Sequence, residues 1–363
     1  MQIDRIRRVT TMLAMTSSLL TFAVLSAGTA LAVDGVIEIN QASAEAGVAL
    51  GDTPGFPVTL MLRGSYRLTG ELSLPADTSG IVIQNDNVHI DLNGFSIVGG
   101  GGVSGDGVVT VTDSPRDVRV SNGTIRNMAR DGVRLGDHAV VENVLSLDNG
   151  NIGIQVGKFG RVLRSTASGS GGAGIVLAGH DGIARDSIAT NSGGNGIDAT
   201  ELCAVERSSG SGNAGDGIYS RSGSRISQSR ASSNQGHGIR ITAGNVTESY
   251  ADHNQMVGIY APFGGLITRS ATRGNDGNGI EGGRAAVITH SSARTNDGHG
   301  IVARDGSLVI GNVAHSNLGY GLFLDHVSGY ADNTLKDNNG NGNQLNGGQS
   351  MGTNLCGSST NCP

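Results

Sequence analysis

Charged side chains are scarce in this 363-residue sequence, in which Asp, Glu, Lys and Arg make up 15% of the residues. Acidic residues outnumber basic ones by 31 to 25, and the formal net charge is −6. Nucleic acids and anionic membrane surfaces attract proteins that carry excess positive charge. The composition therefore argues against a nucleic acid as a partner.

Long apolar runs are missing beyond residue 32, so the rest of the chain predicts no membrane-spanning helix. Residues 1–32 carry three arginines near their start, at positions 5, 7 and 8, continue with an apolar run over 12–24 and end in Ala30-Leu31-Ala32. This order is typical of a secretory signal peptide. We expect a mature chain that starts at Val33 and is secreted or periplasmic. Loss of three Arg and one Asp would change its net charge from −6 to −8.

No segment shows the 3.6-residue period of an amphipathic helix, and the six-residue period of a left-handed β-helix is also missing. Instead, Gly followed by Val, Ile or Leu recurs ten times between positions 132 and 322, at nearly constant intervals. The 60 glycines and the low charge would fit a disordered chain, but so strict a period indicates a repeat architecture. The repeat glycines are Gly132, Gly153, Gly174, Gly196, Gly217, Gly238, Gly258, Gly279, Gly300 and Gly321.

Around each repeat glycine the apolar residues alternate with variable ones. The residue after the glycine is apolar, the next one varies, and the third is mostly small or apolar. This alternation predicts a short strand whose first and third side chains face a core. We expect Ile218, Ile239 and Ile280 to stack in one buried column.

A second apolar position lies nine residues after the glycine, and Ile183 is assigned to it in its repeat. A small polar position follows at residue 12 of the repeat, where we place Asp186, and a small or apolar position at residue 14, where we place Ile188. Position 11 is often basic. Its residues are Arg164, Arg185, Arg207, Arg269 and His290.

Asparagine recurs four residues before most of the repeat glycines. Identical residues one turn apart lie about 4.8 Å from each other, so their amides can hydrogen-bond along a column. We expect an internal asparagine ladder at one corner of the repeat. Its members are Asn149, Asn213, Asn234, Asn254, Asn275, Asn296, Asn317 and Asn338.

These features predict an all-β fold, a single-stranded right-handed parallel β-helix with about 21 residues per coil and capped ends. We expect an N-terminal cap with the first strands over 33–79, including a short helix within 40–49. The β-helix should cover 80–342, and a C-terminal tail or cap should cover 343–363.

Three cysteines are present. In an oxidising compartment we expect Cys356 and Cys362, which flank a small loop, to form a disulfide. Cys203 is left over, either as a small buried residue or as a reactive thiol.

The repeat, with Gly-Ile, then Val or Ile, then Ser or Asn, then Asn, resembles the secreted pectate-lyase-like right-handed β-helix proteins. The stretch Val88-His-Ile-Asp-Leu-Asn-Gly-Phe95 also looks like part of a group of uncharacterised bacterial secreted β-helix proteins. The resemblance covers roughly residues 80–340 and rests on stacking residues. It implies polysaccharide, acidic or neutral, as the ligand. It leaves open whether the protein is an enzyme, which would then be a polysaccharide lyase, an epimerase or a glycoside hydrolase.

Local motifs for chemistry are weak. Gly-His-Gly occurs at 236–238 and 298–300, but the partner motifs of polygalacturonases and the Asp-Pro-His-Asp motif of alginate epimerases are missing. Residues 193–198 match the start of a calcium-binding nonapeptide once, whereas such sites need tandem copies. We expect no metal and no cofactor.

The outward face of the strand that follows each repeat glycine is the best candidate site. It combines aromatic rings that can stack on sugars with charges of both signs. Its expected ligand-binding residues are Asp198, Tyr219, Arg240, Tyr260 and Glu281. The weak catalytic candidates are Asp216 and His237, as an acid–base pair. A polar outer surface is equally what a soluble scaffold would carry.

Two functions follow. The first is binding, with or without modification, of a polysaccharide along the flat side of the helix. The second is a non-catalytic structural or surface-adhesion scaffold of the cell envelope. The absence of long insertions over 132–322 favours binding or structure over turnover. The arginines of position 11 are either neutralised by nearby acids such as Asp186 and Glu206 or form a track for an acidic polysaccharide.

Overall fold

A computed structural model describes residues 35–112, 115–357 and 362. The predicted signal peptide lies outside these residues. The chain divides into a short unit, residues 1–35, and a second unit, residues 36–363, to which all the described strands belong. Over the described residues, no helix has the length and hydrophobicity needed to cross a bilayer.

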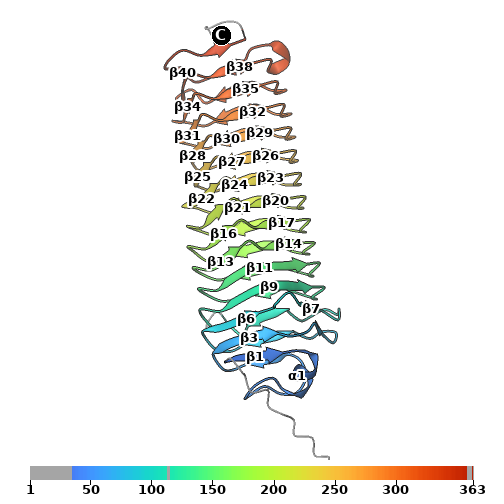
Figure 1. The fold of residues 1–363 in the computed structure, drawn as a ribbon. Helices are drawn as coiled ribbons and strands as arrows, with labels where there is room; N and C mark the ends of the chain where they lie inside the picture. The colour runs from blue at the N-terminus through green and yellow to red at the C-terminus, as the bar shows by residue number, and fades with distance from the viewer. Residues whose placement is uncertain (1–34, 113–114, 358–361, 363) are drawn as a thin grey trace, which may run out of the picture. The chain divides into compact units, whose positions relative to one another are not determined.

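The second unit is an all-β parallel solenoid of about 14 turns, and hydrogen-bonded partners in consecutive turns are mostly about 21 residues apart. Most turns contribute three short strands, which pair in parallel with the same strands of the turns before and after (Figure 1). The predicted fold class is therefore confirmed.

The first strand of every turn joins a sheet of 14 strands, here called the first sheet. Its strands are β2 (Val58–Leu60), β5 (Ile81–Ile83), β8 (Val108–Thr110), β10 (Val133–Arg134), β12 (Ile154–Val156), β15 (Ile175–Leu177), β18 (Ile197–Ala199), β21 (Ile218–Ser220), β24 (Ile239–Ile241), β27 (Ile259–Ala261), β30 (Ile280–Gly282), β33 (Ile301–Ala303), β36 (Leu322–Leu324) and β39 (Leu345–Asn346).

The second and third strands of the turns form a sheet of 27 strands, here called the second sheet, in which two turns run through both positions as β9 (Arg119–Arg126) and β11 (Val140–Leu147). The other second strands are β1 (Val36–Ile39), β3 (Gly64–Leu68), β6 (Val88–Asp91), β13 (Arg161–Leu163), β16 (Ile183–Arg185), β19 (Ala204–Glu206), β22 (Ser224–Ser227), β25 (Gly244–Thr247), β28 (Gly265–Thr268), β31 (Ala286–Thr289), β34 (Leu308–Ile310), β37 (Gly329–Ala331) and β40 (Gln349–Ser350). The other third strands are β4 (Leu72–Ser73), β7 (Ser96–Val98), β14 (Thr166–Ser168), β17 (Ile188–Thr190), β20 (Ser209–Ser211), β23 (Arg230–Ser232), β26 (Tyr250–Asp252), β29 (Ala271–Arg273), β32 (Ser292–Arg294), β35 (Val313–His315), β38 (Thr334–Lys336) and β41 (Leu355–Cys356).

Helical structure is confined to α1 (Gln41–Ala46) and the single 3₁₀ turn η1 (Asn339–Asn341) among the described residues. The side chain of Asn40 accepts a hydrogen bond from the Ser43 backbone nitrogen at 2.9 Å and so caps α1. At the other end, Cys356 and Cys362 form a disulfide. Strand pairing extends past both ends of the 80–342 range, because β2 pairs with β5 and β39 pairs with β36.

The predicted core column is confirmed. Ile218, Ile239 and Ile280 are fully buried, and β21 pairs Ile218 with Ile239 of β24. The repeat glycine next to this column has no room for a side chain. A Cβ on Gly238 would lie 2.6 Å from the Gly258 carbonyl oxygen and 2.6 Å from the Asn254 amide nitrogen. The Gly-Ile signal is therefore a consequence of close packing between consecutive turns.

One turn departs from the predicted register. β16 pairs Val162 with Ala184, so Ala184 faces the core where Ile183 was expected. β17 likewise turns Ala189 inward and leaves Ile188 46% exposed. The step from Gly174 to Gly196 is one residue longer than the steps before and after it, and the extra residue precedes β16. The assignments of Ile183, Asp186 and Ile188 were therefore one residue out of register.

The asparagine ladder is internal, as predicted. The amide nitrogen of Asn234 donates to Oδ1 of Asn254 at 2.8 Å, and the Asn234 backbone nitrogen donates to the same oxygen at 3.1 Å. The ladder ends at Asn338, whose amide nitrogen donates to Oε1 of Gln344 at 2.9 Å. Every amide oxygen in these steps thus receives two donors from the preceding turn.

Candidate functional site

The five predicted ligand-binding residues lie in one register column on the outer surface of the first sheet. Strand pairing aligns Asp198 of β18 with Tyr219, Tyr219 with Arg240 of β24, Arg240 with Tyr260, and Tyr260 with Glu281 of β30. Each is half-buried between core-facing neighbours. We call this set the outer column, and the strands that carry it follow one another in Figure 1.

The position just before the repeat glycine holds varied residues, and where its residue is Asp, Asn or His the side chain accepts a hydrogen bond from the backbone nitrogen of the next turn. Asp216 Oδ1 accepts from His237 at 2.8 Å, and His237 Nδ1 accepts from Val257 at 3.2 Å. Asn278 Oδ1 accepts from His299 at 2.8 Å in the same way. The Gly-His-Gly histidines therefore hydrogen-bond consecutive turns to each other, as Asp216 and Asn278 do.

Charges on this face are compensated locally. Arg240 Nη1 lies 3.7 Å from Asp216 Oδ2, and Arg304 Nη2 lies 3.5 Å from Glu281 Oε1. The amide of Asn195 donates to Asp198 at 2.9 Å. Arg240, one of the expected ligand-binding residues, therefore already has a carboxylate beside it. The face offers many donors and acceptors but little net charge.

The aromatic rings stack along the solenoid axis. His237 and Tyr260 have ring centroids 4.8 Å apart and an interplanar angle of 25°, and the Arg240 guanidinium lies 5.2 Å from the centroid of Tyr219. His299 and Phe323 repeat the arrangement at 4.7 Å. A neighbouring side chain thus covers part of each ring face, so ring edges and hydroxyls are the groups best placed to meet a ligand.

Acid–base catalysis by Asp216 and His237 would have to use side chains that already accept hydrogen bonds from backbone nitrogens. Asp216 and His237 are 7% and 8% exposed, and among the described residues no hydrogen bond joins their side chains. Burial lowers the pKa of His237, because the charged imidazolium is poorly solvated there. Burial also raises the pKa of Asp198, an effect that the nearby Asp216 charge reinforces. Asp198 is the carboxyl on this face best suited to hold a proton.

No group of three or more His, Cys, Asp or Glu residues that could hold a metal ion occurs within the described part of the chain. Cys203 is buried, and burial raises the pKa of its thiol. Its Sγ lies 3.4 Å from the Gly179 carbonyl oxygen and 3.3 Å from that of Glu201. This environment is that of a packed thiol rather than a reactive one.

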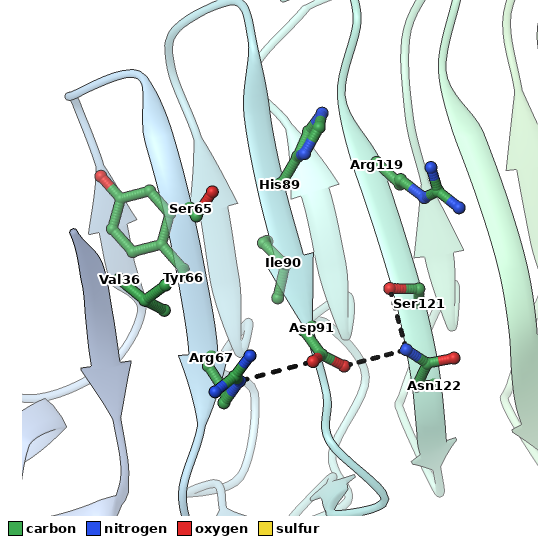
Figure 2. A pocket seen from close by; sticks show the side chains of 10 residues that line it. All are labelled: Val36, Ser65, Tyr66, Arg67, His89, Ile90, Asp91, Arg119, Ser121 and Asn122. Carbon is green, nitrogen blue, oxygen red and sulfur yellow. Dashed lines mark hydrogen bonds and ion pairs between the residues drawn. The ribbon is translucent and has the colours of Figure 1, made fainter. Parts of the chain in front are cut away.

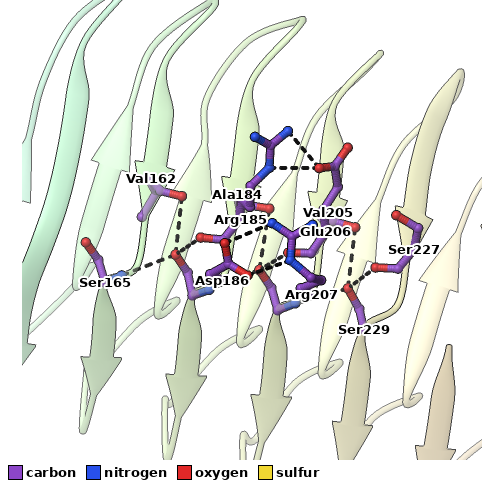
Figure 3. Close-up of polar contacts among 12 residues, drawn as sticks. Val162, Ser165, Ala184, Arg185, Asp186, Val205, Glu206, Arg207, Ser227 and Ser229 are labelled. Carbon is purple, nitrogen blue, oxygen red and sulfur yellow. Dashed lines mark hydrogen bonds and ion pairs between the residues drawn. The ribbon is translucent and has the colours of Figure 1, made fainter.

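The arginines of position 11 are neutralised, as one of the two interpretations held. Arg207 donates to both carboxylate oxygens of Asp186 at 2.7 and 2.9 Å, and Arg185 donates to Glu206 at 2.8 Å (Figure 3). Arg164 pairs with Glu142. The register shift places Asp186, not Arg185, between Arg164 and Arg207 in the corner column. Asp186 has a positive φ of 52°, as expected for a residue of this column. Arg207 holds the pKa of Asp186 below its usual range.

Near the N-terminal end, an open pocket of about 270 Å³ lies on the outer surface of β3, β6 and β9. His89 and Asp91 project into it from β6, beside Arg67 and Arg119 (Figure 2). Asp91 lies 3.5 Å from Arg67 and accepts from Asn122 at 3.1 Å. We did not predict this cluster, although the alternation Val88-His-Ile-Asp-Leu92 signals two outward polar residues.

The comparisons with known proteins concern the fold. A family model described as a right-handed β-helix region matches residues 197–361. The A-module of mannuronan C-5 epimerase AlgE4 from Azotobacter vinelandii has 14% identity and a TM-score of 0.48, covering 88% of this chain and 94% of that one. The periplasmic alginate epimerase AlgG has 11% identity and a TM-score of 0.37, covering 89% and 83%.

The catalytic domain of a GH87 alpha-1,3-glucanase is a third solved structure of this kind, with 14% identity, a TM-score of 0.37, and coverage of 80% of this chain and 60% of that chain. No curated protein sequence matches the chain. The predicted resemblance to right-handed β-helix proteins is thus confirmed at the level of fold, which by itself specifies no reaction.

Proposed function

We propose that the protein binds a polysaccharide along the outer column of the first sheet. The observation that carries the proposal is the alignment of Asp198, Tyr219, Arg240, Tyr260 and Glu281 on five consecutive strands. Strands hold side chains more rigidly than loops do, so these groups are preorganised for a ligand. A side chain about every 4.8 Å along a straight line suits an extended polymer of repeating units.

The local pairing of charges favours a polymer recognised mainly through hydroxyl groups on this face. Arg240 and Glu281 each have a partner within 4 Å, so a strongly charged ligand would have to displace an existing ion pair. Neutral hydroxyls can instead bond to the free edges of the same groups. Binding is better supported than turnover, because Asp216 and His237 accept backbone hydrogen bonds that connect the turns.

We further propose that the protein works outside the cytoplasm. The disulfide between Cys356 and Cys362 supports this location, because such bonds persist in oxidising compartments. The signal-peptide pattern of residues 1–32 supports it as well.

A triple variant, Tyr219→Ala with Arg240→Ala and Tyr260→Ala, tests the outer column. We expect it to lose retention on neutral glycans in a glycan array and in affinity electrophoresis. The matched control is Arg225→Ala with Asn245→Ala and Leu266→Ala, three aligned residues on the outer surface of the second sheet. Unchanged retention in the first variant, with its circular dichroism spectrum intact, would eliminate this face and leave the scaffold function ahead.

Modification of the glycan is tested separately. The products of prolonged incubation are assayed for unsaturated sugar ends and for new reducing ends. If either appears, Asp198→Asn is the variant to compare, because Asp198 is the carboxyl of this face with a raised pKa.

A further inference from the structure

We propose that the outer surface of the third strands carries a second binding site, a cationic track for an acidic polysaccharide. The track is formed by Arg273 of β29, Arg294 of β32, His315 of β35 and Lys336 of β38. Pairing aligns Arg273 with Arg294, Arg294 with His315, and His315 with Lys336. These four residues therefore occupy one column on four consecutive turns, about 4.8 Å apart. The site is on a different sheet from the outer column and does not rest on the function proposed above.

The track is a column of neighbouring basic residues with almost no countercharge. Arg273, Arg294 and Lys336 are exposed, and within the described residues their side chains make no ion pair and no hydrogen bond. Of the four, His315 is the one with an ion pair among the described residues, with Nε2 at 3.3 Å from Asp337. In the corner column, by contrast, Arg207 is paired with Asp186 of the turn before it.

Unpaired like charges on adjacent strands repel one another, and cross-strand pairs of this kind weaken a sheet. The column of basic residues begins at Arg273. Asp252 of β26 is the residue aligned with Arg273, and it is buried and paired with Arg230 at 3.0 Å. The turn before Arg273 is thus neutralised, whereas Arg273, Arg294 and Lys336 have no ion pair within the described residues. A polyanion bound along the column would offset this repulsion, so its binding there would be favourable.

The surface beside the track is hollowed. An open pocket of about 540 Å³ is lined by Arg273, Arg294 and His315 together with the hydroxyl residues Ser292 and Thr295. Tyr250 closes its N-terminal side, with the Arg230 guanidinium 5.4 Å from its ring centroid. Hydroxyl donors next to guanidinium groups suit a ligand that carries both sugar hydroxyls and anionic groups.

The spacing and the whole-molecule charge favour an acidic polysaccharide over a polynucleotide. The column is straight and its charges are one turn apart, which matches a linear polymer with anionic groups at intervals. The chain as a whole has a net charge of −6, so a polymer with a dense phosphate backbone would be repelled by the rest of the surface. Carboxylate or sulfate groups are the shared chemistry that the guanidinium forks would bind.

The test compares two triple variants that remove the same amount of charge. The first is R273Q with R294Q and K336Q. The control is R225Q with R269Q and R284Q, three exposed arginines away from the track. Binding of oligogalacturonate, heparin and neutral dextran is measured by titration calorimetry at two salt concentrations. We expect wild-type protein to bind one or both anionic probes more weakly at high salt, whereas any binding of dextran should not depend on salt.

The track variant should bind the anionic probe at least about tenfold more weakly, while the control variant should bind it as wild type does. Equal losses in both variants would show that net charge alone matters and would overturn the site. A stronger affinity for a single-stranded oligonucleotide than for either acidic glycan would overturn the ligand class. Absence of binding to both acidic probes by the wild type would also overturn it.

The outer-column triple variant separates this proposal from the previous one. If oligogalacturonate binding survives in that variant and is lost in the track variant, the track is the anionic site. If the reverse is found, the track proposal fails while polysaccharide binding by the first sheet stands. The stability of the track variant is a further check, because relief of repulsion should leave its thermal midpoint equal to or above that of wild type in the absence of ligand.

Discussion

The amide nitrogen of Asn254 lies 2.8 Å from Oδ1 of Asn275, and the backbone nitrogen of Asn254 lies 3.0 Å from the same oxygen. One side-chain oxygen in each turn thus satisfies two donors of the turn before it. The amide nitrogen of Asn275 also donates to the Ala251 carbonyl oxygen at 3.1 Å. Asn275 therefore connects its own turn to the preceding one through groups that have no access to water.

Asn275→Leu should therefore destabilise the protein by about 1–3 kcal/mol, because it leaves two buried donors of Asn254 without an acceptor. The denaturation midpoint in urea measures the effect. Gln255→Leu is the matched control, since Gln255 is exposed on the turn that carries Asn254. Equal midpoints for the two variants would show that the ladder adds nothing to stability.

Ile239→Asp should unfold the turns around β24, because it places an unpaired charge in the fully buried isoleucine column. Ile188→Asp makes the same substitution at a side chain that is 46% exposed and should be tolerated. Thermal unfolding followed by circular dichroism compares the two. A variant at Ile188 that melts as early as the one at Ile239 would contradict the register described for β17.

The core was predictable because its residues repeat with the turn. Identical residues contact each other one turn apart, as at Gly238, Ile239 and Asn254. The period alone therefore indicates the roles of these residues. The longer step from Gly174 to Gly196 was visible, but the place of its extra residue was not, since Ile183 and Ala184 both suit a buried position. Only the pairing with Val162 shows which of them faces inward.

The candidate sites were less predictable because they depend on side-chain partners in neighbouring columns. The outer column was found from its alternation, but the ion pair of Arg240 with Asp216 depends on side-chain conformations. Arg273 and Arg294 lie one full repeat apart, so their alignment was visible in the sequence. The lack of a countercharge beside both arginines was not visible, because it depends on the direction in which the acidic side chains of the adjacent strands point.

Cys203 should not react with thiol reagents in the folded protein. Burial raises the pKa of its thiol, so the reactive thiolate is even rarer near neutral pH than in an unfolded chain. With Cys356 and Cys362 joined, titration with a chromogenic disulfide reagent should detect no thiol in the native protein and one after denaturation. Reduction before denaturation should raise the count to three. A native-state thiol would contradict the buried position of Cys203.

The two stacked histidines should make stability depend on pH. His237 Nδ1 accepts from the Val257 backbone nitrogen at 3.2 Å, and His299 Nδ1 accepts from that of Tyr320 at 2.9 Å. Both hydrogen bonds need an unprotonated Nδ1, and burial lowers the pKa of both side chains. The unfolded chain, with histidine pKa values of about 6.5, then binds more protons than the folded chain. The stability that the neutral rings contribute is complete above about pH 6.5 and is lost as the pH falls through the lowered folded values.

His237→Asn with His299→Asn isolates this effect, because asparagine already fills the same position elsewhere. Asn195 Oδ1 accepts from the Asp216 backbone nitrogen at 2.9 Å, so the double variant keeps an acceptor and removes only the titration. The raised pKa of Asp198 has the opposite effect on stability, because the contribution of its protonated form is lost as the pH rises. This effect is the same in wild type and in the double variant. Thermal midpoints between about pH 7.5 and 5 should fall more steeply for wild type than for the variant. Parallel curves would mean that protonation of these rings is not coupled to the stacking of the turns.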